Sequence, residues 1–178
     1  LDYERLWKIK IFIFIRKEDF YKISSIQEGK EVCGIANIVR NKGATAVKFK
    51  FNNTSLCFVD SHFAAHQDRV HERNDDYTRI LGGLKLGLKH FSIDNQFDHV
   101  FWLGDLNYRI DLKRDNVLEL IEKEDWKTLL EADQLKNQIK LGKVFANWNE
   151  GDIKFSPTYR FIRNTNMYNE ELGRIPAW

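Results

Sequence analysis

The stretch from Ala44 to Asp60 constrains the fold most, because it predicts two adjacent strands joined by a short turn. In "ATAVKFKF" the apolar residues alternate with two lysines, which is the period of a half-buried strand. "NNTS" is rich in turn-forming residues, and "SLCFVD" follows it as a second strand. We therefore expect an antiparallel hairpin here.

A helix and another strand follow this hairpin. Apolar residues recur at helical spacing from Val70 to Leu88, which predicts an amphipathic helix over about residues 68–90, weakened at Gly82-Gly83. "FDHVFWLG" then has the composition of a buried strand. A hairpin combined with a crossover favours a mixed α and β fold with packed sheets, and not a purely doubly wound sheet.

Other elements follow from shorter patterns. We expect strands at "LWKIKIFIFI" (6–15) and "EVCGIANIVR" (31–40), and helices at "NVLELIEK" and "DWKTLLEADQL" with Asn116 and Asp125 as N-caps. There is no internal repeat and no linker of low complexity. The 178 residues, 43% of them hydrophobic, suit one domain or a large part of one.

Composition narrows the class of protein. The formal net charge of +2 gives no reason to expect a protein that coats nucleic acid. Cys33 and Cys57 imply no disulfide framework, so a reducing compartment is expected. The apolar run around Ile11–Ile15 is far shorter than the ~20 residues of a membrane-spanning helix. The chain starts at Leu1 and not at Met, so we expect a fragment, incomplete at both ends.

The decapeptide "FWLGDLNYRI" places several polar groups directly after a strand. Asp105 and Asn107 alternate, so in extended geometry they point the same way. A carboxylate can orient or deprotonate water, and an amide can stabilise a developing oxyanion. The pair therefore suits hydrolysis of a phosphate ester, although a simple Asp-Asn turn explains the same residues.

"DSHFAAHQDRVHERNDDY" (60–77) follows "SLCFV", the second predicted strand of the hairpin. His62 could donate a proton to a phosphoryl oxygen. The spacing of His62, His66 and His71 matches no zinc pattern. We interpret the charged residues that follow, through Asp76, as the solvated face of the next helix.

Two further stretches offer cationic groups. In "KFSPTYRF", Tyr159 and Arg160 follow the turn at Pro157 and could bind a phosphate, or they could belong to an ordinary turn with an exposed arginine. In "VRNKGA", residues 41–43 favour a hairpin turn, which leaves Lys42 available to a phosphate.

Taken together, these stretches resemble the inositol polyphosphate 5-phosphatases, and in particular the type II enzymes similar to the Lowe-syndrome protein. The matching pieces are "RNKGA", "SLCFVDSHFAAHQDRVHERNDDY", "FWLGDLNYRI", "LEADQL", "NEGDIKFSPTYRF" and "RIPAW", in the family's order. They cover most of residues 31–178, so the resemblance makes 1–178 part of a catalytic domain. It also implies an α+β fold of two packed mixed β-sheets flanked by helices, which is the four-layer fold of the deoxyribonuclease-like endonucleases, exonucleases and phosphatases.

The resemblance assigns roles to residues. It makes His62, Asp105 and Asn107 catalytic: Asp105 orients the attacking water, Asn107 stabilises the phosphoryl oxygens and His62 contacts the scissile phosphate. It also implies substrate-binding residues, namely Asn41 and Lys42 on the 1-phosphate side and Tyr159, Arg160 and Arg174 at the 4-phosphate. Mg²⁺ is the implied cofactor, and no metal ligand is assigned among these residues.

Departures from the family pattern matter too. Arg40 stands where the family has Gly, and Leu172 where a Lys is common. The family's upstream metal-binding Glu and its downstream Ser-Asp-His are expected outside this chain, so residues 1–178 alone are expected to be inactive.

The expected function is Mg-dependent removal of the 5-phosphate from phosphoinositides or soluble inositol polyphosphates. The expected setting is cytoplasmic and peripheral to membranes, with a head group as partner and no nucleic acid. The alternatives are a phosphoinositide-binding remnant without catalysis and a nuclease of the same fold.

Overall fold

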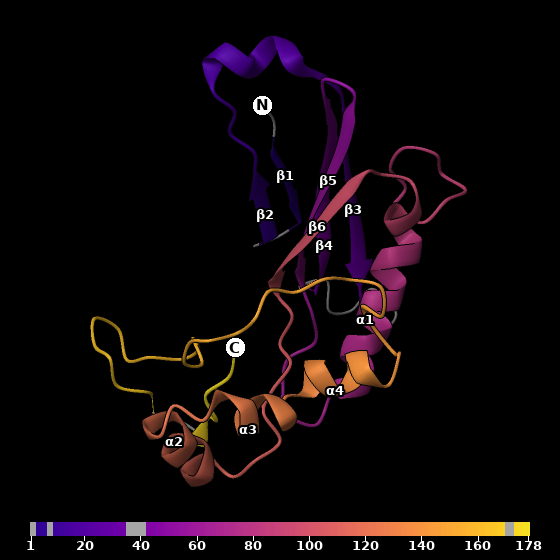
Figure 1. Cartoon of the computed structure of the whole chain (residues 1–178). Coiled ribbons are helices and arrows are strands. Elements are labelled where there is room, and N and C mark those ends of the chain that lie inside the picture. Colours follow the sequence, from indigo (N-terminus) through magenta and orange to yellow (C-terminus); the bar gives the residue numbers. More distant parts are fainter. Residues whose placement is uncertain (1–2, 7–8, 35–41, 170–172) are drawn as a thin grey trace. The chain divides into compact units, whose positions relative to one another are not determined.

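A computed structural model of the chain describes residues 3–6, 9–34, 42–169 and 173–178 (Figure 1). The chain packs as two compact units. The first, here the sheet unit, contains residues 1–64 and 71–107, and the second, here the helical unit, contains residues 65–70 and 108–178. Each unit is described by itself below.

The sheet unit is built on a four-stranded sheet in the order β3-β4-β5-β6. Its strands are β3 (Ile23–Cys33), β4 (Lys42–Phe51), β5 (Thr54–His62) and β6 (His99–Asp105). β4 and β5 form the hairpin that the sequence predicts, and β6 pairs with β5 in parallel. A parallel neighbour requires a crossover, which contains α1 (Val70–Gly83) and the short 3-10 helix η2 (Ile93–Asn95). The expectation of a mixed α and β fold is thus confirmed.

A second, two-stranded sheet pairs β1 (Tyr3–Leu6) with β2 (Ile9–Phe12), and the 3-10 helix η1 (Lys17–Lys22) leads from it to β3. The single strand expected over residues 6–15 is therefore wrong, and residues 7 and 8 lie outside the described ones. Ile11 of β2 packs with Val47 and Phe49 of the large sheet in one apolar cluster. Burial of this cluster is what joins the two sheets.

Other expected boundaries also shift. The strand expected over residues 31–40 ends at Cys33, and residues 35–40 lie outside the described ones. Lys42 and Gly43 are strand residues of β4, so they do not form the expected turn. β6 is less buried than its composition suggests, because it lies at the edge of the described sheet and leaves Phe101 48% exposed.

Helix α1 is shorter than expected. It ends at Gly83 and not near residue 90, although Leu84 is still buried just beyond it. Gly82 and Gly83 are weak helix formers, so they terminate the helix instead of merely weakening it. Leu88, the last member of the predicted apolar stripe, is 65% exposed.

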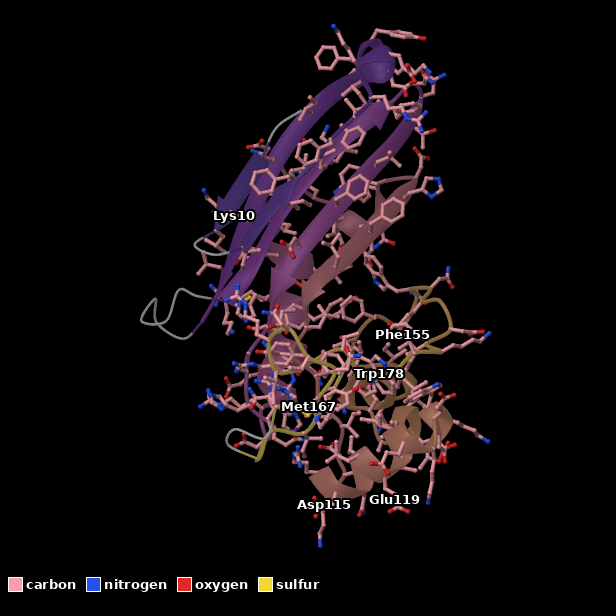
Figure 2. All side chains as sticks on the ribbon, turned by 90° about the vertical axis from the view of Figure 1, so that its left-hand side faces the viewer. Lys10, Asp115, Glu119, Phe155, Met167 and Trp178 are labelled. Atoms are coloured by element: carbon pink, nitrogen blue, oxygen red, sulfur yellow. The ribbon has the colours of Figure 1, made fainter. Side chains whose placement is uncertain are left out.

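The helical unit contains α2 (Arg114–Glu122), α3 (Trp126–Glu131) and α4 (Gln134–Lys140). Its core gathers Ile110, Val117, Leu129 and Ala177. Asp115 and Glu119, on the exposed side of α2, extend away from the unit in Figure 2. Apolar burial on one side of each short helix therefore positions the loops that follow them.

The predicted caps are half right. Asp125 caps α3, since its side chain accepts a hydrogen bond from the Thr128 N–H. Asn116 is not a cap, because α2 begins two residues earlier, at Arg114. "DWKTLLEADQL" forms two helices and not one, because Asp133 caps a new helix, α4.

Both cysteines are buried thiols. Among the described residues, no helix is long and apolar enough to cross a membrane.

Candidate active site

The parallel pairing of β5 and β6 brings two predicted catalytic residues together. His62 and Asp105 are register partners at the ends of the two strands. Register partners point to the same face of a sheet, and His62 Nε2 lies 3.5 Å from Asp105 Oδ2. The Asp105 side chain is 63% exposed and that of His62 31%, so both are open to a ligand.

Gly104 makes this arrangement possible. Its φ of +119° is a conformation that residues with a side chain rarely adopt. A Cβ atom there would lie 2.1 Å from the Ser61 carbonyl oxygen on the neighbouring strand. The glycine therefore allows the close backbone approach that sets Asp105 opposite His62.

Lys42, the first residue of β4, contacts the same imidazole. Its Nζ lies 2.5 Å from His62 Nε2. The ammonium can only donate, so Nε2 accepts and the ring proton resides on Nδ1. Burial lowers the pKa of His62, the charge of Lys42 lowers it further, and Asp105 opposes both. Because the pKa of His62 is lowered, we interpret its ring as neutral. It therefore forms no full ion pair with Asp105, which would need a protonated ring.

Asn107 does not continue the strand. β6 ends at Asp105, and Asn107 has a φ of +57°, so the two side chains do not alternate as predicted. The Asn107 N–H donates to Asp105 Oδ1 at 3.1 Å, which is the Asp-Asn turn considered above. Its carboxamide Nδ2 donates to the Phe63 carbonyl at 3.0 Å. Asn107 therefore links the turn after β6 to the segment after His62.

The predicted residues for the 4-phosphate lie in the helical unit. Tyr159 and Ala177 exchange two backbone hydrogen bonds, of 3.0 and 2.9 Å. The Arg174 guanidinium lies over the Tyr159 ring, 4.1 Å from its centre. The Arg160 carbonyl accepts from the Asn169 N–H. Tyr159 and Arg174 thus form a stacked pair.

Asn41, expected on the 1-phosphate side, lies outside the described residues. So does Leu172, which stands where a Lys is common in the family.

Sequence reasoning missed a half-buried carboxyl near the catalytic pair. Asp60 precedes His62 by two residues on β5, and burial raises the pKa of its carboxyl to about 6. The alternation of strand residues, which puts Asp60 and His62 on one face, was a signal that could have found it.

It also missed a polar network in the helical unit that explains "LEADQL". Gln134 Nε2 donates to Asp111 Oδ1 and to the Gln67 carbonyl, at 2.7 and 3.0 Å. Gln134 Oε1 accepts from the Arg109 N–H at 2.9 Å. This glutamine therefore fixes the segment that follows "FWLGDLNYRI".

A metal site is not complete among these groups. Within the described part of the chain, no three His, Cys, Asp or Glu side chains gather to hold an ion. Mg²⁺ takes near-octahedral oxygen coordination, and the one exposed carboxylate of the catalytic pair falls well short of it. We therefore derive no catalytic step through a metal from these residues.

The mixed sheet with flanking helices agrees with comparisons to known proteins. The chain belongs to the endonuclease/exonuclease/phosphatase family, because residues 1–178 match its family 2 over their whole length.

More specific relatives include synaptojanins and phosphatidylinositol 3,4,5-trisphosphate 5-phosphatases. The chain is 40% identical to human synaptojanin-1 over 176 residues, which is 98% of this chain and 11% of that protein. It is 42% identical to human phosphatidylinositol 3,4,5-trisphosphate 5-phosphatase 1 over 187 residues, covering 97% of this chain and 16% of that one. The resemblance to the inositol polyphosphate 5-phosphatases is confirmed.

A solved structure agrees over the whole chain. The inositol polyphosphate 5-phosphatase domain of SPsynaptojanin, in complex with inositol (1,4)-bisphosphate and a calcium ion, superimposes with a TM-score of 0.90 at 36% identity. The match covers 100% of this chain and 52% of the solved one. The chain thus spans about half of that domain and a small part of each curated relative.

Proposed function

We propose that the full-length protein removes the 5-phosphate from phosphoinositides or soluble inositol polyphosphates. The observation that carries the proposal is the pairing of His62 with Asp105 at the ends of β5 and β6, with Lys42 against the same imidazole. The relatives support it, since they include phosphatidylinositol 3,4,5-trisphosphate 5-phosphatases.

Each residue has a role in this proposal. Asp105, the exposed carboxylate, orients the attacking water and takes its proton. His62 and Lys42 offer hydrogen-bond donors and positive charge to the oxygens of the scissile phosphate. Asn107, fixed by Phe63, contributes its amide at the same strand end. Water and the phosphomonoester become inorganic phosphate and the free inositol hydroxyl.

Substrate and cofactor belong to the proposal as well. We assign Arg160, Arg174 and Tyr159 to the 4-phosphate and Asn41 to the 1-phosphate side. Lys42, which the resemblance places on the 1-phosphate side as well, is assigned to the scissile phosphate because it contacts His62. A divalent cation is supported by the calcium ion in the solved neighbour, and we propose Mg²⁺. When bound, it would neutralise charge that develops on phosphate oxygens. A cytoplasmic protein that contacts membranes peripherally would meet such lipids.

Phosphate release by the full-length protein tests this function. Asp105→Asn should lower kcat by ~10²–10⁴, the usual worth of acid–base assistance. Asp115→Asn makes the same chemical change on the exposed side of α2 and should leave kcat unchanged. The substrates are a 4,5-bisphosphorylated inositol lipid, its soluble head group and a duplex with an abasic site.

The substrate arms separate the alternatives. Cleavage of the abasic duplex with no phosphate release would favour a nuclease. Lipid binding without turnover would favour a non-catalytic remnant. Wild-type turnover by folded Asp105→Asn would refute the catalytic assignment.

A further inference from the structure

The dipeptide Phe63–Ala64, directly after His62, is held at all four of its backbone polar groups. The Phe63 N–H donates to the Asp105 carbonyl at 3.0 Å, and the Phe63 carbonyl accepts from Asn107 Nδ2 at 3.0 Å. The Ala64 N–H donates to Asp76 Oδ2 at 2.8 Å, and the Ala64 carbonyl accepts from an Arg73 guanidinium nitrogen at 3.1 Å. β6 and the turn after it thus bind the backbone of Phe63, and helix α1 binds the backbone of Ala64.

On the α1 side, Arg73 and Asp76 depart from the expected solvated helix face, which is otherwise confirmed by the exposed residues His71, Glu72 and Asp75. Arg73 is fully buried, with 0% of its surface exposed, and Asp76 is partly buried. Burying a charged group is costly unless hydrogen bonds compensate. Burial raises the pKa of Asp76, and the Ala64 N–H is the largest influence that opposes it. Helix α1 therefore directs two charged side chains, whose burial is costly, at the backbone N–H and carbonyl of one residue, Ala64.

The Phe63–Ala64 segment is linked to all three predicted catalytic residues. Ala64 follows His62 by two residues, and Phe63 is bonded to the backbone of Asp105 and to the side chain of Asn107. A displacement of Ala64 would reach His62 along the chain and Asn107 through Phe63. Small displacements of catalytic groups, of about 1 Å, can lower rates by ~10²-fold.

We propose that Arg73 and Asp76 are positioning residues, which hold the Phe63–Ala64 segment so that His62 and Asn107 keep their places beside Asp105. Neither residue touches the reacting atoms in this scheme. The proposal rests on the proposed phosphatase function for its kinetic consequence. Its structural consequence, the placement of the His62 ring, does not depend on what the protein hydrolyses.

The test uses Asp76→Asn and Asp76→Ala in the full-length protein, with Asp75→Asn as the matched control. Asn keeps an oxygen that can accept from the Ala64 N–H, whereas Ala removes it. Asp75 is the exposed neighbour on the same helix. Arg73→Lys is a second probe, because it keeps the charge and loses the planar guanidinium.

Three measurements are made on each variant: the melting temperature, kcat and KM for phosphate release, and the imidazole ¹⁵N shifts of His62. We expect Asp76→Ala to lower kcat by ~10–100-fold, as loss of a supporting partner typically does, and Asp76→Asn to lower it less. KM should change by less than ~3-fold, because the substrate contacts themselves remain. The His62 shifts should move in both Asp76 variants and stay unchanged in Asp75→Asn.

The outcomes are distinct. Unchanged kcat and His62 shifts in folded Asp76→Ala would overturn the proposal. A fall in kcat that only matches the loss of folded protein, with His62 shifts as in the wild type, would assign Asp76 a purely structural role and also overturn it. If the wild type releases no phosphate, the proposed function fails, and movement of the His62 shifts still decides the positioning role.

Discussion

The imidazole of His62 shows how single charges set the chemistry of this site. Lys42 and Asp105 both approach Nε2, one as a cation and the other as an anion. Burial and Lys42 lower the pKa of His62, so the neutral ring prevails near neutral pH. A neutral ring accepts from Lys42 and leaves that lysine its positive charge. Of these two residues, Lys42 and not His62 therefore supplies the positive charge that the proposed function offers to a phosphate.

Arg174 provides the first prediction, at the same scale. Its guanidinium is held over Tyr159, and the proposal has it bind a 4-phosphate. A charge-assisted contact is worth ~1.5–3 kcal/mol, so Arg174→Met should lower kcat/KM by ~10–150-fold for a 4,5-bisphosphate. The loss should be small for a substrate that lacks the 4-phosphate. Steady-state kinetics on both substrates measure the difference.

The control for this prediction is Arg163→Met, which removes an exposed arginine in the same unit. Equal losses on both substrates in Arg174→Met would indicate general electrostatics, and the 4-phosphate assignment would be withdrawn.

Among the elements, α4 is a helix whose start depends on a buried carboxylate. Asp133, 7% exposed, accepts the Lys136 N–H at 2.8 Å, yet burial raises the pKa of its carboxyl to about 6. The folded state therefore binds this proton more tightly than the unfolded state. The stability from this group is full below the ordinary pKa of 3.8 and is lost as the pH rises through about 6.

Asp133→Asn should remove this pH dependence, because the amide keeps an acceptor oxygen and does not ionise. Relative to the wild type, the variant should gain stability between about pH 4 and pH 7, by at most ~3 kcal/mol for a shift of about two pKa units. Urea unfolding followed by tryptophan fluorescence at both pH values measures it. Asp133→Ala, which loses the cap, should be less stable than Asp133→Asn at both. Parallel pH profiles in the wild type and Asp133→Asn would contradict the prediction.

What the sequence could predict follows from how local each signal is. The β4–β5 hairpin was predictable because lysines alternate with apolar residues on either side of a turn. The break between β1 and β2 was not, because the run "LWKIKIFIFI" contains no turn-forming residue. Asn116 has the composition of a cap but lies inside α2, so residue type alone does not fix a helix start.

The site was predictable to a similar degree. The motif residues Asp105 and His62 are register partners in the structure, and this register depends on pairing between strands far apart in the sequence. Arg73 is buried because it donates to the Ala64 carbonyl, nine residues earlier in the chain. A charged residue within a predicted helix gives no sign of such a partner, so the sequence could not reveal this burial.

At the scale of the whole molecule, the predicted roles divide between the two units. The sheet unit contains His62, Asp105 and Asn107, and the helical unit contains Tyr159 and Arg174. The chain passes between the units at residues 64–65, 70–71 and 107–108. The last of these passages lies inside "FWLGDLNYRI", directly after Asn107. That motif therefore contains both the end of β6 and the first residues of the helical unit.

Residues 1–178 expressed alone are expected to release no phosphate from inositol phosphates. The chain covers 52% of the solved phosphatase domain, and the described residues bring together no three metal-binding side chains. Catalytic groups act as a unit, so a partial set loses most of the rate enhancement. The edge strand β6 also leaves Phe101 and Leu103 exposed, which favours aggregation of an isolated segment.

The measurement compares this segment with the full-length protein on a 4,5-bisphosphorylated inositol substrate, with Mg²⁺ at millimolar concentration. Circular dichroism and size exclusion establish whether the segment is folded and monodisperse, and the Asp105→Asn full-length variant sets the background rate. We expect the segment to match that background, because its His62, Asp105 and Asn107 lack the further ligands that a hard cation requires. Turnover within ~tenfold of the full-length protein would show that these groups suffice by themselves, which would contradict the expectation that catalysis needs further residues outside this segment.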